Sequence, residues 1–154
     1  MLKYIPEDTS VTFAEIPDEI SLCINITNCP HRCEGCHSQY LWKDIGDELT
    51  FSTIDYLAYK NAGITCVTLM GGDSDKEYMK QLALHISSLG LLSAWYSGEV
   101  ELDLNEYGKF FDYIKVGPYI KELGPLNSRT TNQKMYKVNR KTNSIEDITY
   151  RFWK

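Results

Sequence analysis

Strand-like and helix-like segments alternate through the middle of the chain, and this alternation limits the possible folds more than any other feature of the sequence. Apolar, β-branched runs typical of buried strands are separated by amphipathic segments that begin with helix-capping residues. Such alternation predicts parallel pairing, with right-handed crossovers that align the carboxyl ends of the strands at one edge. The expected strands are residues 20–27, 65–70, 91–96 and 112–117.

The helix expected after the second strand has the clearest sequence signals. Ser74-Asp-Lys-Glu77 resembles a capping box, apolar residues follow at helical spacing, and Gly90 suits the position just beyond a helix. An earlier helix is expected to begin near Ser52 and to end before Gly63, and a shorter one is expected over residues 105–111.

The last third of the chain has a different pattern. Two strand-like segments, Lys134–Asn139 and Ile145–Arg151, flank a turn-like sequence and predict a hairpin. Four or five parallel strands are too few for an eight-stranded barrel, which needs at least about 200 residues. We therefore expect an α/β fold in which a partial, open (β/α) barrel of mostly parallel strands ends in a C-terminal β-hairpin, built as one domain over residues 1–154.

Three cysteines follow the first expected strand, and they are the strongest indication of chemistry. The run Cys29-Pro-His-Arg-Cys33-Glu-Gly-Cys36 supplies three thiolates, which are ligands for iron–sulfur clusters, zinc or Cu(I). Because no fourth cysteine follows, a [4Fe–4S] cluster held here would keep one iron open to a substrate or cofactor. A structural zinc site is the competing interpretation, and His31 and His37 are compatible with it, although no second ligand pair lies downstream.

The other two cysteines, Cys23 and Cys66, lie in expected strands with β-branched neighbours. We interpret both as core residues, with Cys23 as a remote candidate for a fourth cluster ligand. An odd count of five cysteines without a secretory segment argues against a disulfide framework and for a reducing, cytoplasmic location. A net charge of -5 with scattered basic residues argues against nucleic acid as a partner, and the absence of a long apolar run argues against a membrane span.

Two motifs in this order resemble those of the radical S-adenosylmethionine superfamily. They are Cys29-x3-Cys33-x2-Cys36 after the first strand and Gly71-Gly72-Asp73 after the second. The stretch from Cys36 to Trp42 is similar to that of enzymes that install glycyl radicals. Asn127-Ser-Arg-Thr-Thr-Asn-Gln133 is similar to the tail of the activating enzymes of anaerobic ribonucleotide reductases. The likeness spans about Ser21 to Gln133, with three departures: Gly35 replaces a common aromatic residue, Asp73 replaces the commoner Glu, and only the Thr131-Asn132-Gln133 end of the tail stretch matches closely.

The resemblance implies a [4Fe–4S] cluster on Cys29, Cys33 and Cys36, with S-adenosylmethionine at the fourth iron and no catalytic residue beyond the cluster ligands. It implies reductive cleavage of this cofactor and hydrogen abstraction from a glycine of the catalytic subunit of anaerobic ribonucleotide reductase. Flavodoxin or ferredoxin is implied as the reductant. The implied cofactor contacts are Gly35, Cys36, His37, Gly71, Gly72, Asp73, Ser97 and Lys115.

Two other functions stay open at this stage. One is a radical S-adenosylmethionine enzyme that acts on a small molecule, such as a deazapurine-type synthase. The other is a non-catalytic zinc or electron-transfer module. Individual residues also have ordinary structural explanations: Asp73 could help to cap the next helix, Ser97-Gly98 could be a simple turn, and Lys115 could be a solvated strand end.

Overall fold

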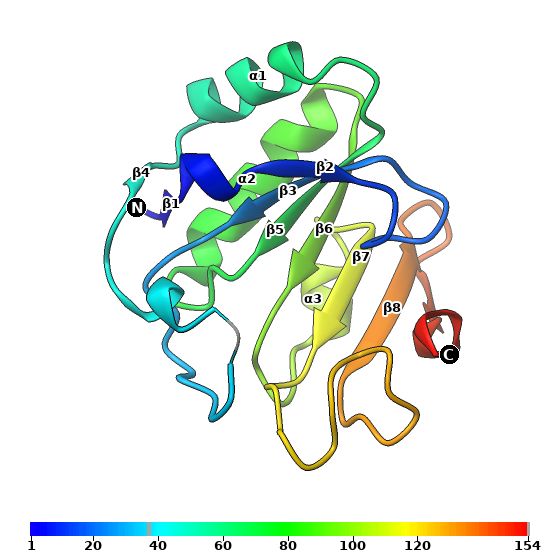
Figure 1. Ribbon diagram of the computed structural model, residues 1–154. Coiled ribbons are helices and arrows are strands. Elements are labelled where there is room, and N and C mark those ends of the chain that lie inside the picture. Colours follow the sequence, from blue (N-terminus) through cyan, green and yellow to red (C-terminus); the bar gives the residue numbers. More distant parts are fainter. Residues whose placement is uncertain (37, 154) are drawn as a thin grey trace.

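The structure is a computed structural model that describes residues 1–36 and 38–153. Its centre is a mixed sheet, shown in Figure 1, with the strand order β2-β3-β5-β6-β7-β8-β9. A separate two-stranded sheet pairs β1 (Lys3–Tyr4) with β4 (Asp47–Glu48). The central strands are β2 (Ser10–Thr12), β3 (Ser21–Asn25), β5 (Cys66–Met70), β6 (Leu92–Tyr96), β7 (Tyr113–Val116), β8 (Lys134–Asn139) and β9 (Ser144–Asp147).

The four strands expected from the sequence form the parallel centre of this sheet. β3, β5, β6 and β7 are neighbours in that order, and each pairs in parallel with the next. Their carboxyl ends therefore lie at one edge, as expected for strands joined by right-handed crossovers. The loops that leave this edge carry the cysteines, Gly71-Gly72-Asp73 and Ser97.

Three α-helices occur among the described residues: α1 (Phe51–Lys60), α2 (Lys76–Ser88) and α3 (Leu104–Tyr107). The residues that cap α1 and α2 lie close to the predicted capping residues but are not the same ones. Thr50 forms the capping box of α1 with Thr53, and Asp75 rather than Ser74 caps α2 by accepting from the Tyr78 N–H at 3.2 Å. Single-turn 3-10 helices lie at η1 (Pro6–Asp8), η2 (Gln39–Trp42) and η3 (Thr149–Phe152).

The predicted partial, open (β/α) barrel is wrong. Both flanks of the parallel centre are antiparallel, because β2 pairs antiparallel with β3, and β8 pairs antiparallel with both β7 and β9. The strand–helix repeat therefore stops at β7, and the sheet ends in two edge strands instead of curving into a barrel. The predicted C-terminal hairpin is present as β8 and β9.

Side chains alternate between the two faces of the sheet and form two apolar clusters. In Figure 1, α2 and α3 lie behind the sheet and α1 lies above it; on the face that these helices cover, the cluster includes Leu22, Leu69, Ile86, Trp95, Phe111 and Ile114. On the opposite face, loops and chain ends provide the cover, and the cluster includes Ile16, Cys66, Ala94, Tyr113, Met135 and Ile148. No helix among residues 1–36 and 38–153 is long and apolar enough to cross a bilayer.

Cys23 and Cys66 are core residues, as predicted. Their exposed fractions are 4% and 0%, and burial raises the pKa of each thiol to about 12. A thiol that stays protonated is a poor metal ligand, because the thiolate is the ligating form. These two thiols are therefore buried and protonated, whereas the three in the loop after β3 are partly exposed.

Candidate functional site

Loops from the carboxyl edge of the sheet meet around one carboxylate, Asp73. The loop after β3 contributes His31, the loop after β5 contributes Asp73 itself, and the loop after β6 contributes Ser97 and Gly98. Lys115, on β7, reaches the same edge and donates to the carbonyl oxygen of Ser97. The sequence-based expectation that these loops gather is confirmed.

The cysteine loop turns back on itself through three residues with positive φ. Asn28, Arg32 and Gly35 have φ values of 60°, 48° and 76°, a conformation that glycine adopts without strain and other residues rarely adopt. The Cys29 N–H donates to the Leu41 carbonyl at 3.0 Å and anchors the loop to η2. The loop leaves the thiols of Cys29, Cys33 and Cys36 partly exposed.

Backbone groups within the loop are directed at its sulfur atoms. Burial raises the pKa of Cys29, while backbone N–H groups of His31 and Arg32 lower it by hydrogen bonding to the sulfur. The Ser38 N–H donates to Cys36 Sγ at 3.4 Å. The N–H donors therefore offset part of the effect of burial, which still raises the Cys29 pKa overall, and they would stabilise the negative sulfur of a metal-bound thiolate.

The three thiols are not drawn together around a single point in this structure. Two sulfurs on one zinc ion, each at about 2.3 Å, can be no more than about 4.6 Å apart. Within the part of the chain that the structure describes, the three sulfurs are not gathered within 4.8 Å of one another, whereas ligand atoms of His31, Asp73 and Glu99 are. A [4Fe–4S] cluster would place the three sulfurs farther apart than a single zinc ion does, because each cysteine binds a different iron.

Asp73 is the most enclosed charged group at this edge, with a side chain that is 2% exposed. Its Oδ1 accepts from Ser97 Oγ at 2.6 Å, and its Oδ2 accepts from the Gly98 N–H and from His31 Nε2, each at 2.8 Å. Since Asp75 caps α2, Asp73 has no capping role and instead faces the cysteine loop.

Gly71 and Gly72 have packing reasons to be glycine. Both have positive φ, 114° and 96°. A Cβ on Gly72 would lie 2.4 Å from Met79 Sδ, and one on Gly71 would lie 3.0 Å from the Ile26 carbonyl oxygen. Trp95 Nε1 donates to the Gly71 carbonyl at 2.8 Å, so the core fixes the loop that ends in Asp73.

Lys115 is a partly buried cation with no carboxylate partner among the described ion pairs. Its Nζ donates to the carbonyl oxygens of Gly117 at 3.0 Å and Ser97 at 3.4 Å. Burial lowers the Lys115 pKa to about 8, even though the negative charges of Asp73, Cys33 and Cys29 act in the opposite direction. A buried ammonium without a counter-ion is costly, so the site has unused capacity for an anion.

Replacing Lys115 with Met is expected to stabilise the cluster-free protein at pH 7, by at most about 3 kcal/mol. Between pH 8 and 10.5 the folded protein loses the Lys115 proton before the unfolded chain does. The free energy of unfolding of the wild type therefore rises with pH relative to that of the variant, and the difference between the two proteins becomes smaller. Urea denaturation of both proteins at a series of pH values measures this closing gap. Lys137→Met, at an exposed lysine on β8, is the control, and a gap independent of pH would contradict the prediction.

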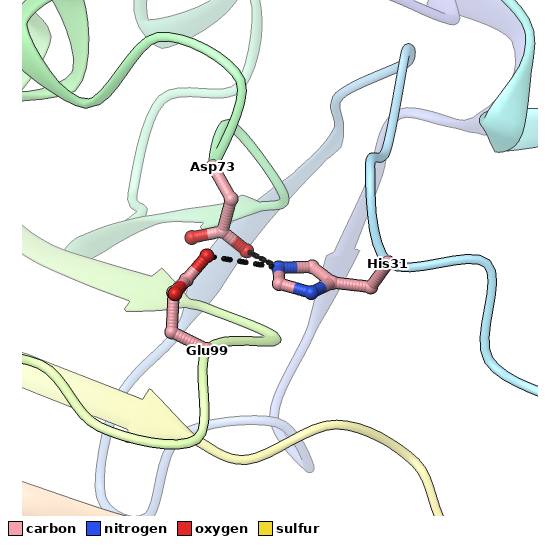
Figure 2. Close-up of side chains that lie close together, drawn as sticks. All are labelled: His31, Asp73 and Glu99. Carbon is pink, nitrogen blue, oxygen red and sulfur yellow. Dashed lines mark hydrogen bonds and ion pairs between the residues drawn. The ribbon is translucent and has the colours of Figure 1, made fainter.

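Figure 2 shows two residues of this site that the sequence-based prediction did not assign to it. His31 and Glu99 lie beside Asp73, and His31 Nε2 is 3.4 Å from Glu99 Oε1. Lys76 Nζ also lies 3.3 Å from that oxygen. His31 lies inside the cysteine motif, which was a usable signal, whereas nothing local marks Glu99.

The remaining predicted residues have mixed outcomes. Gly35 lies in the cysteine loop and faces the loop after β7, where a Cβ would lie 3.3 Å from Tyr119 Cε2. His37 lies outside the described residues. In the tail motif, Asn132 Nδ2 donates to the Pro118 carbonyl and Gln133 Nε2 to the Gly117 carbonyl, so both support the loop that follows Lys115.

Comparison with known proteins supports the assignment of the cysteine loop as an iron–sulfur site. A sequence model of the 4Fe-4S single cluster domain family matches residues 20–122, which is more than half of the chain and includes all three loop cysteines. No curated protein and no solved structure gives a significant match. The loop thiols, their N–H donors and this match agree, and the chain belongs to the 4Fe-4S single cluster domain family.

Proposed function

We propose that this protein is a cytoplasmic radical S-adenosylmethionine enzyme that activates anaerobic ribonucleotide reductase by generating a glycyl radical. The observation that carries the proposal is the placement of Asp73 and Lys115 on either side of Ser97, at the sheet edge that carries the cysteine loop. An enclosed carboxylate and an ammonium without a counter-ion are complementary to the amino and carboxylate groups of the methionine moiety. An electron carrier has no need for such a pair.

In this proposal each residue has a limited role. Cys29, Cys33 and Cys36 hold the [4Fe–4S] cluster and leave one iron open. Asp73 binds the ammonium, and Lys115 binds the carboxylate. The cluster would supply the electron, received from flavodoxin or ferredoxin, for reductive cleavage of S-adenosylmethionine, after which hydrogen is taken from a glycine of the partner subunit.

A cavity of about 570 Å³ offers a route for that glycine. It lies beside Tyr96, at the carboxyl end of β6, and Lys115 Nζ is 5.9 Å from the centre of the Tyr96 ring. Its volume is within the usual range for ligand sites. Its lining includes Ala14, Glu15, Pro17, Leu126, Asn127, Arg151 and Phe152.

The proposal is tested by reconstituting the protein anaerobically with iron and sulfide, reducing it, and adding S-adenosylmethionine with or without the reductase. We expect formation of 5′-deoxyadenosine and, only with the reductase, a glycyl-radical signal in electron paramagnetic resonance. 5′-Deoxyadenosine without a glycyl radical would favour a small-molecule substrate. A cluster that leaves the cofactor intact would favour electron transfer, and bound zinc would favour a structural module.

Ala14→Trp is expected to separate the two stages of this reaction. The indole would occupy the cavity, so the glycyl-radical signal should fall by about tenfold or more, while cofactor cleavage without the partner should stay at the wild-type rate. Ala62→Trp is a matched control, because Ala62 is also an exposed alanine but lines a different hollow. Equal effects of the two variants would contradict a role for this cavity.

A further inference from the structure

His31 points away from the cysteine loop that carries it. Its ring lies between Asp73 and Glu99, as Figure 2 shows, and its side chain is 19% exposed. Room for the ring exists because Gly98 has no side chain: a Cβ there would lie 2.6 Å from His31 Cδ2. The ring thus links the loop after β3 to the loops after β5 and β6.

The hydrogen bonds of Asp73 use three of the four acceptor positions of its carboxylate. A carboxylate oxygen has two lone pairs, and both of those on Oδ2 are taken, one by the Gly98 N–H and one by His31. Oδ1 is bonded to Ser97 Oγ, and the side chain as a whole is 2% exposed. The one remaining position, on Oδ1, belongs to this enclosed side chain, so a ligand ammonium gains access to Asp73 by replacing one of the present donors. His31 is the donor that can leave, because its side chain is partly exposed, whereas the other two belong to the turn after β6, which backbone hydrogen bonds from Ser97 to Lys115 and from Gly117 to Glu99 hold against β7.

We infer that His31 is a placeholder for the ammonium of the cofactor, an inference that rests on the function proposed above. In the cofactor-free protein the imidazole keeps the enclosed carboxylate hydrogen-bonded, which avoids the cost of an unsatisfied buried acceptor. S-Adenosylmethionine must displace the ring, so its apparent affinity is the intrinsic affinity multiplied by the fraction of molecules in which His31 has left Asp73.

The first test is titration calorimetry of S-adenosylmethionine into the reconstituted protein. His31→Ala should lower the dissociation constant by about fivefold or more, since the competing hydrogen bond is lost. His31→Gln keeps a donor and should lie nearer the wild type. His85→Ala is the matched control, because His85 Nε2 makes a similar contact, 2.7 Å from Asp55 Oδ1, between α1 and α2. An unchanged or higher dissociation constant for His31→Ala would overturn the inference.

The second test uses the metal-free protein and does not depend on the cofactor. Loss of the contact with Asp73 should free the cysteine loop, so His31→Ala should speed alkylation of Cys29 and Cys33 by iodoacetamide, read by mass spectrometry, whereas His85→Ala should not. Rates equal to the wild type would overturn the inference. If the wild type binds S-adenosylmethionine without cleaving it, the proposed function fails while the affinity test still decides the role of His31. If neither protein binds it, both proposals fail.

Discussion

Alanine at any one of Cys29, Cys33 and Cys36 is expected to abolish the iron–sulfur cluster. A cluster held by three thiolates has no spare ligand, and no other thiol in the described structure is suited to replace one, because burial holds Cys23 and Cys66 in the protonated form. Iron and sulfide content after anaerobic reconstitution, with the absorption and electron paramagnetic resonance spectra, measures the loss.

Cys23→Ala is the matched control for this experiment. It removes a thiol from β3, only a few residues before the loop, and should keep the full iron content with a modest loss of stability. Loss of iron from Cys23→Ala would make Cys23 a fourth ligand and would close the open iron on which the proposed chemistry depends. Zinc in the purified wild type, in place of iron and sulfide, would also remove the open iron on which the proposed chemistry depends.

Asp73→Asn is expected to weaken S-adenosylmethionine binding by about 10- to 100-fold, the usual effect of losing a hydrogen bond to a charged group. The substitution keeps the shape of the side chain but removes the charge that would face the ammonium. Calorimetric titration of the reconstituted protein gives the affinity, and 5′-deoxyadenosine formation should fall in parallel at low cofactor concentration.

Asp112→Asn controls for the structural part of that change. Asp112 also accepts from a backbone N–H, that of Ser93 at 2.9 Å, and pairs with Arg140, but it lies at the amino end of β7. Both variants should lose stability, whereas only Asp73→Asn should lose affinity. If the two variants bind the cofactor equally well, Asp73 has no part in recognising it.

Local patterns explain which parts of the fold were predictable from the sequence. Met79, Leu82, Ala83 and Ile86 repeat at helical spacing, and all four are fully buried on α2. The parallel strands are continuous apolar runs, which is how strands buried on both faces appear. The barrel prediction failed because strand direction at the sheet edges depends on distant pairing: β2 has three residues, and only its register with β3 makes it a strand.

In the site, too, local motifs were predictable from the sequence, whereas contacts between distant residues were not. The cysteine spacing and Gly71-Gly72-Asp73 are contiguous motifs, so the sequence could indicate them and the structure brings them together. The bond from His31 to Asp73 joins residues 42 positions apart and depends on a glycine at position 98. The sequence could suggest His31 as a metal ligand but not its position against a carboxylate, because that position depends on the relative placement of three loops.

The indole of Trp95 gives the molecule an optical reporter. Of the three tryptophans, Trp95 is fully buried, and its hydrogen bond to Gly71 connects it to the loop that ends in Asp73. The emission of an indole responds to the polarity and hydrogen bonding around it. With Trp42 and Trp153 changed to Phe, fluorescence would follow the arrival of a ligand at this loop in solution, without a label.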